Sequence, residues 1–128
     1  MIAPVCPYCL KTSELVGGDV IYPRRPDLSQ KRFFLCKPCD AYVGCHPGTV
    51  VALGRLANKE LRTWKIKAHE AFDPLWQTGK MSRSNAYELM CRMINITRNE
   101  AHIGLFNVDQ CKLLIKKISE LKTPQLPL

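Results

Sequence analysis

Hydrophobic residues recur at two different spacings along this 128-residue chain. Up to about residue 53, short apolar runs alternate with glycine, proline and charged residues, a pattern typical of strands and turns. Residues 17–19 (Gly-Gly-Asp) predict a hairpin turn that leads into a strand at 20–22. Further strands are predicted at 31–35 and 40–44, so the first third of the chain should form a small antiparallel sheet.

The hydrophobic period becomes helical after residue 53. Apolar side chains repeat every three or four residues between Leu61 and Leu75, which defines one face of a helix. Asn58 or a nearby residue should open this helix. Pro74 should end it, because the residue before a proline avoids the α conformation.

Two further helices are predicted from their caps and apolar faces. Ser82 or Ser84 can cap the first, and Asn107 or Asp109 the second. The expected fold is therefore α+β. A zinc ribbon with a small antiparallel β-sheet is assigned to residues 1–53. A three-helix unit follows over 54–128 and is expected to pack with the ribbon as one compact unit.

Two cysteine pairs, each with two residues between its members, lie within the strand region. The first pair is in Cys-Pro-Tyr-Cys and the second in Cys-Lys-Pro-Cys. This spacing lets both thiolates of a pair reach one ion, and a four-cysteine tetrahedral zinc site has sulfur ligands at about 2.3 Å. The predicted ligands of one structural zinc ion are Cys6, Cys9, Cys36 and Cys39.

A compact turn, Gly-Cys-His-Pro-Gly-Thr at 44–49, follows the second pair. Cys45 or His46 could serve as an alternative zinc ligand or belong to a second site. Four cysteines already complete a closed zinc site, however, so we favour a buried structural role for Cys45.

The number of cysteines and the lengths of the apolar runs indicate where in the cell the protein is expected. Seven cysteines are an odd number, and residues 1–6 have neither the basic nor the apolar region of a secretion signal. No apolar run approaches 18 residues, so no membrane-spanning helix is expected. We therefore expect a cytoplasmic protein whose cysteines are ligands and free thiols.

The formal net charge of +8 is compatible with an acidic partner such as nucleic acid, although many small soluble proteins are basic without binding one. Phe33 and Phe34 are adjacent in a predicted strand, so one ring should point outward, where it could stack on an unpaired base. The candidate nucleic-acid-binding residues are Arg24, Arg25, Lys31 and Arg32.

The three histidines offer a different chemistry. His69 and Asp73 are four residues apart on the first helix, so the carboxylate can orient the imidazole as in a general base or a metal ligand. A common surface pair on a helix explains the same spacing, and we favour that explanation. If the segments converge, the candidate catalytic residues are His46, His69, Asp73, His102 and Arg62.

Several stretches together resemble a family of zinc-finger-containing proteins of unknown function that is found in bacteria and their phages. The most specific of them is Cys-Asp-Ala-Tyr-Val-Gly-Cys-His at 39–46; others are Leu-Gly-Arg-Leu-Ala-Asn at 53–58, Phe-Asp-Pro-Leu-Trp at 72–76 and Ala-His-Ile-Gly at 101–104. The resemblance implies a zinc-binding phage or prophage protein acting in a bacterial cytoplasm. It implies no reaction and no catalytic residue.

Three functions are compatible with these observations. The preferred one is a zinc-binding module, phage-encoded, that engages nucleic acid or a nucleic-acid-processing host or phage protein through a basic surface. The second is a metal-dependent nuclease built on the histidines. The third is an interaction or inhibitor protein without nucleic-acid contact, for which binding should depend little on salt.

Overall fold

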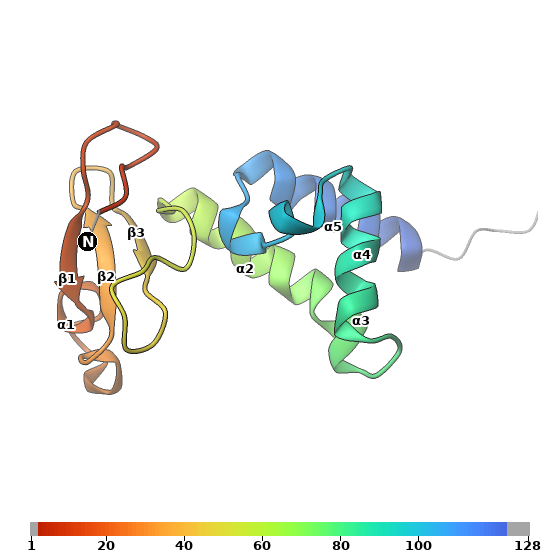
Figure 1. Cartoon of the computed structure of the whole chain (residues 1–128), viewed down its shortest axis with the longest axis horizontal. Coiled ribbons are helices and arrows are strands. Elements are labelled where there is room, and N and C mark those ends of the chain that lie inside the picture. Colours follow the sequence, from red (N-terminus) through yellow and green to blue (C-terminus); the bar gives the residue numbers. More distant parts are fainter. Residues whose placement is uncertain (1–2, 123–128) are drawn as a thin grey trace, which may run out of the picture. The chain divides into compact units, whose positions relative to one another are not determined.

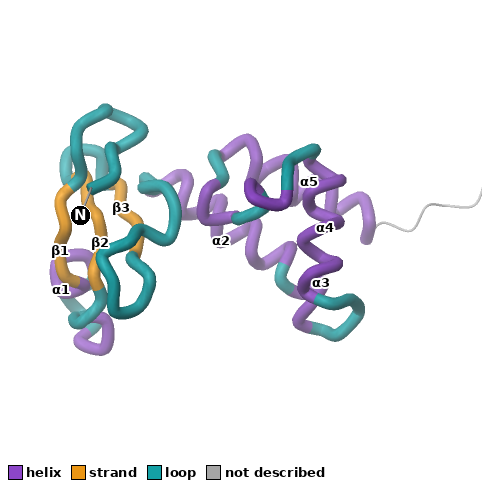
Figure 2. Tube along the Cα trace, viewed as in Figure 1, coloured by secondary structure: helices purple, strands orange, loops and turns teal. Residues whose placement is uncertain are grey.

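The computed structural model describes residues 3–122 and divides the chain into two compact units, Met1–Glu60 and Leu61–Leu128 (Figure 1). The first unit contains the strands and the second is built from helices, as Figure 2 shows. The predicted α+β class with an N-terminal ribbon-like sheet is confirmed. Among the described residues, no helix has both the length and the apolar character needed to cross a membrane.

The sheet of the first unit has three antiparallel strands in the order β1-β2-β3. Val16 pairs with Phe33 across the first two strands, and Cys36 pairs with Ala41 across the second and third. The predicted strands at 31–35 and 40–44 are thus confirmed to within one residue. The strands are β1 (Glu14–Gly17), β2 (Arg32–Cys36) and β3 (Ala41–Gly44).

The segment after β1 differs from the expected hairpin and strand. Residues Gly18–Ile21 form a short helix, α1, and a 3-10 turn, η1, follows at Pro26–Leu28. A Cβ on Gly18 would lie 1.8 Å from the Leu28 carbonyl oxygen, so the two chain segments approach closely. The Gly18 N–H donates to the Lys31 carbonyl at 2.7 Å. The prediction was wrong here because the close approach, and not the β-forming side chains, determines the path.

The two faces of β2 are both covered. Phe34 is fully buried with Leu56 in the core of the ribbon, which also includes Cys6, Cys36 and Ala41. Phe33, on the opposite face, is 9% exposed because the rings of Tyr22 and Tyr42 pack edge-on against it at 5.8 and 6.0 Å between centroids. The two rings therefore alternate as predicted, but neither is available for stacking on a base.

Residues between β3 and the first long helix extend the sheet. Tyr42 pairs with Ala57 and Cys45 with Ala52 in isolated antiparallel bridges. Leu56 from this segment is 1% exposed in the ribbon core. The segment that follows β3 thus completes the ribbon before the helical period begins.

The second unit contains three helices of twelve or more residues, in agreement with the predicted three-helix arrangement. Its core consists of apolar side chains that all three contribute, including Phe72, Met90 and Leu114, each with no exposed surface. The helices are α2 (Lys59–Phe72), α3 (Pro74–Gln77), α4 (Arg83–Ile94) and α5 (Val108–Lys122), with 3-10 turns η2 (Arg98–Glu100) and η3 (Ile103–Leu105) before α5.

Local capping explains where these helices begin and end. The Ser82 hydroxyl accepts a hydrogen bond from the Asn85 N–H at 3.1 Å and so caps α4. Asn107 and Gln110 satisfy one another's backbone N–H groups at 2.8 and 2.9 Å before α5. Pro74 occupies the first position of α3, where its missing N–H is not needed. Of the two candidates predicted for each cap, Ser82 and Asn107 make the capping hydrogen bonds.

Candidate metal centre

The two cysteine pairs lie in tight turns at the same end of the three-stranded sheet. Cys6 and Cys9 are in the turn enclosed by the Val5–Thr12 bridge. Cys36 is the last residue of β2, and Cys39 lies in the turn that leads into β3. The sheet register therefore brings together residues that are about thirty positions apart in the sequence.

Backbone hydrogen bonds shape both turns. The Leu10 N–H donates to the Cys6 carbonyl at 2.8 Å, and the Asp40 N–H donates to the Lys37 carbonyl at 3.1 Å. Leu10 and Asp40 both adopt positive φ angles, of 65° and 50°, which are uncommon for residues other than glycine. The fold therefore accepts two strained positions, each directly after the second cysteine of a pair, to hold the sulfurs in place.

The four sulfur atoms have the spacing that a tetrahedral metal ion requires. All of them lie within 4.8 Å of one another, and the Cys9 and Cys36 sulfurs are 3.6 Å apart. Sulfurs at about 2.3 Å from a tetrahedral zinc ion would be about 3.8 Å from each other. Cys6 and Cys36 are buried and the other two are half-buried, so one ligand of each pair is shielded from water. A closed four-cysteine site of this kind suits a structural zinc ion.

The environment of the sulfurs affects how readily they ionise. The backbone N–H of Lys11 lowers the pKa of Cys9 to about 7, so this thiolate forms readily at neutral pH. Burial raises the pKa of Cys39 to about 12 when no cation is present. A metal ion would supply the positive charge that allows all four thiolates to coexist, because coordination deprotonates a thiol.

A family comparison agrees with this geometry. The model of the zinc-finger-containing domain matches residues 2–121, nearly the whole chain. The chain belongs to the family of zinc-finger-containing domains. No curated protein and no solved structure is significantly similar to it. Family membership and the sulfur cluster together confirm the predicted zinc-binding module and its cofactor.

Cys45 of this zinc-finger-containing domain lies outside the four-sulfur group. Its side chain is half-buried and packs against the ribbon core, and burial raises the pKa of its thiol. The predicted packing role agrees with this position, although Cys45 is half-buried and not fully buried, and it also lines the hollow described below. His46 is exposed on the loop that follows and is likewise outside the group.

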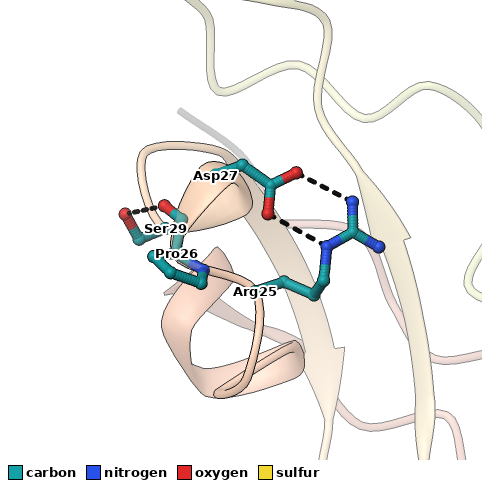
Figure 3. Close-up of polar contacts among 4 residues, drawn as sticks. All are labelled: Arg25, Pro26, Asp27 and Ser29. Atoms are coloured by element: carbon teal, nitrogen blue, oxygen red, sulfur yellow. Dashed lines mark hydrogen bonds and ion pairs between the residues drawn. The ribbon is translucent and has the colours of Figure 1, made fainter.

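The basic residues of the ribbon differ in their surroundings. Arg25 forms a bidentate pair with Asp27, with nitrogen–oxygen distances of 2.8 and 2.9 Å (Figure 3). This contact raises the pKa of Arg25 and lowers that of Asp27. Lys31 and Arg32 are exposed and line a hollow of about 810 Å³, whereas Arg24 is exposed and is not among the lining residues.

The candidate catalytic residues are distributed over both units. His69 Nδ1 lies 3.3 Å from an Asp73 carboxylate oxygen, so the predicted helical pair is present. His102 instead lines a cavity with Arg83 and Arg98. Arg62 is half-buried on α2. Among the described residues, the four cysteines form the one group of three or more potential metal ligands, and the nuclease stays a prediction.

The cavity at His102 was not recognised from the sequence. It measures about 370 Å³ and is lined by Arg83, Ser84, Tyr87, Arg98 and His102. These residues come from the first turns of α4 and from the segment that follows it, and no short motif connects them. Their shared character, cations around one aromatic ring, becomes visible when the segments are folded.

Proposed function

We propose that the zinc ribbon binds nucleic acid through the hollow that Lys31 and Arg32 line. The observation that carries this proposal is the composition of the hollow. Two exposed cations and His46 lie around a concave surface of about 810 Å³, which is completed by the loop at residues 45–51. Phosphate groups are attracted to such a surface because their contact with cations releases condensed counterions.

The charge balance of the hollow supports an anionic partner. Asp27 is the one carboxylate among the described lining residues, and Arg25 already neutralises it through two hydrogen bonds. Among the described lining residues, no second carboxylate is available to pair with Lys31 or Arg32. We assign Arg25 the role of neutralising Asp27, and Lys31 and Arg32 the direct contacts to phosphate.

The aromatic residues of β2 restrict the kind of binding that we propose. Phe33 and Phe34 are buried, so neither supplies a stacking platform for a base. The exposed Val51 and the half-buried Val50 provide an apolar wall beside the cations. The proposed contacts are therefore mainly to the sugar–phosphate backbone, with little sequence preference and a steep dependence on salt.

The proposal includes the setting that the resemblance implies, a phage-encoded protein acting in the cytoplasm of its bacterial host. There a zinc-stabilised ribbon would hold its basic surface rigid while it contacts host or phage nucleic acid. A nucleic-acid-processing protein that presents acidic side chains is the alternative partner for the same surface, and oligonucleotide binding separates the two.

Fluorescence anisotropy with labelled single-stranded and double-stranded oligonucleotides tests the proposal. The double variant Lys31→Glu with Arg32→Glu is compared with Lys11→Glu, an exposed lysine of the same unit that does not line the hollow. Removing two phosphate contacts should make the dependence of affinity on salt less steep. The magnitude of the slope of log K against log salt should fall by about 1.4 for single strands and by about 1.8 for duplexes. Lys11→Glu should leave the slope close to that of the parent.

Two outcomes would contradict this function. Equal affinities and slopes for the double variant and the Lys11→Glu control would remove the hollow as the contact surface. Absence of oligonucleotide binding at low salt, together with retention of an acidic host protein that the double variant loses, would assign the surface to a protein partner.

A further inference from the structure

The cavity of about 370 Å³ in the second unit carries a concentration of positive charge that the ribbon hollow does not involve. Arg83 and Ser84 reach it from the first turn of α4, Tyr87 from the next turn, and Arg98 and His102 from the segment after that helix. All five side chains are exposed or half-buried, so a ligand in solution can reach them.

Aromatic rings hold the two guanidinium groups in place. The Arg98 guanidinium lies 4.7 Å from the centroid of the Tyr87 ring, and that of Arg83 lies 5.5 Å from it. Arg83 also lies 5.1 Å from the Trp76 ring, and Tyr87 packs edge-on against the buried Phe72 at 5.0 Å. Cation–π contacts to a ring that is itself packed on the core reduce the freedom that each arginine would lose on binding.

The charge of this pair is not balanced by protein carboxylates. Among the described residues, neither Arg83 nor Arg98 has an ion-pair partner, and no acidic residue lines the cavity. The nearby Glu100 is occupied, because its carboxylate accepts hydrogen bonds from the N–H and the hydroxyl of Thr97 at 2.9 Å, which lowers its pKa. Two neighbouring cations without a counter-charge favour a bound anion.

The distribution of charge between the units points the same way. The second unit has eleven Lys and Arg against six Asp and Glu, and the first has eight against five. Four thiolates on one zinc ion carry two negative charges in excess of the metal, which lowers the positive charge of the first unit further. The helical unit is therefore the more basic part of the zinc-bound protein.

We propose that the cavity formed by Arg83, Arg98 and His102 is a binding site for a phosphate group. Guanidinium forks bind phosphate oxygens in pairs, and the hydroxyls of Ser84 and Tyr87 add neutral donors at the same cavity. The volume is at the small end of the range for ligand pockets and admits a phosphate with an attached sugar or base. The phosphate can be a terminal monoester or an internal diester of a nucleic acid.

Trp76 provides a direct reporter, because its ring is in contact with Arg83. The chain has two tryptophans, so Trp64→Phe leaves Trp76 as the source of tryptophan emission. This protein is titrated with inorganic phosphate, with a 5′-phosphorylated single-stranded oligonucleotide and with the same oligonucleotide ending in a 5′-hydroxyl. Phosphorus NMR of the inorganic phosphate gives an independent measure of binding.

The variants Arg83→Gln and Arg98→Gln remove one fork each, and Arg98→Lys keeps the charge without the fork. Arg92→Gln, an exposed arginine on α4 that does not line the cavity, is the matched control. Each Gln variant should weaken phosphate binding by roughly 10-fold or more, since hydrogen bonds to charged groups are among the stronger ones. Arg98→Lys should be intermediate, and Arg92→Gln should bind as the parent does.

Every outcome of these titrations bears on the site. Tight binding of the 5′-phosphorylated strand alone supports a terminal monoester, and equal binding of both strands that depends on Arg83 and Arg98 supports an internal diester. The proposal is overturned if inorganic phosphate changes neither Trp76 emission nor its own phosphorus signal and neither oligonucleotide changes Trp76 emission. The proposal is also overturned if oligonucleotide binding depends on Lys31 and Arg32 while Arg83→Gln and Arg98→Gln bind with the affinity of the parent. Such a result would leave the ribbon hollow as the nucleic-acid surface.

Discussion

Replacing Cys36 with serine removes one of the four sulfurs at the end of β2 while changing a single atom. The side chain is 6% exposed and lies in the ribbon core beside Phe34 and Leu56. A serine hydroxyl does not ionise near neutral pH and is a poor ligand for zinc, so a four-coordinate site would lose a ligand without replacement. The substitution therefore tests the metal without greatly altering the packing.

The expected effect follows from the size of the ribbon core. The large buried apolar side chains of the first unit, on both faces of its sheet, are Phe33, Phe34 and Leu56. Burial of each stabilises the fold by about 1.5–3 kcal/mol, or about 5–9 kcal/mol together. A structural zinc ion contributes about 10–16 kcal/mol in small zinc-binding peptides. The metal thus outweighs the apolar core, and we expect the first unit to unfold when it is lost.

Metal content per chain, measured by elemental analysis on protein purified without added metal, is the first assay. The second is the dispersion of backbone amide signals from the first unit in NMR spectra. Cys45→Ser is the matched control, because Cys45 lies in the same unit and packs on the same core but is outside the sulfur group. Trp64 and Trp76 both belong to the second unit, so tryptophan emission reports on the helices separately.

The parent and Cys45→Ser should each hold one zinc ion per chain and keep their dispersed amide signals. Cys36→Ser should hold none and lose the dispersion of the first unit, with tryptophan emission unchanged because no zinc ligand lies in the helical core. A full equivalent of zinc in Cys36→Ser would refute the assignment of this ligand. Dispersed ribbon signals in metal-free protein would refute the energetic argument. A second metal that is lost on replacing His69 or His102 would support the nuclease.

Three further predictions concern the second unit. Leu114→Ala, at a fully buried position, should lower the free energy of unfolding by about 2–5 kcal/mol. The control Leu113→Ala, at a 38% exposed position, should change it by less than about 1 kcal/mol. Urea unfolding followed by tryptophan emission measures both. Ser82→Ala removes the α4 cap and should lower the free energy of unfolding by about 1 kcal/mol in the same assay. The control Ser84→Ala, at a serine that does not cap the helix, should leave it nearly unchanged. Burial raises the pKa of Cys111 to about 11, so little of this thiol is ionised at pH 8. Iodoacetamide should therefore modify Cys111 far more slowly in folded than in denatured protein, as measured by mass spectrometry. Equal rates would contradict its burial.

The parts of this protein that the sequence determined are those that depend on neighbours a few residues away. Two residues between cysteines are enough to place both sulfurs on one ion, and the strands beside Cys36 and Cys39 follow from their apolar alternation. The start of α4 at Ser82 and the break before Pro74 are likewise local, because a cap or a proline acts within one helical turn. The metal centre and the helices could therefore be predicted.

The tertiary structure decided what depends on partners that are distant in the sequence or that the pattern does not specify. Gly18 turns away from the sheet because the backbone at Leu28 and Lys31 lies against it. Phe33 is covered because Tyr22 and Tyr42 reach its face, which alternation alone would leave open. In each case the deciding contact joins residues about ten positions apart.

The phosphate cavity is the clearest example of that limit. Arg83 and Arg98 are fifteen residues apart, and each alone resembles an ordinary surface cation. They share a site because both guanidiniums contact the Tyr87 ring, which packs on Phe72. Spacing along the chain can specify which residues share a turn or a helix face. Which side chains meet across turns and helices is determined by packing of the folded core.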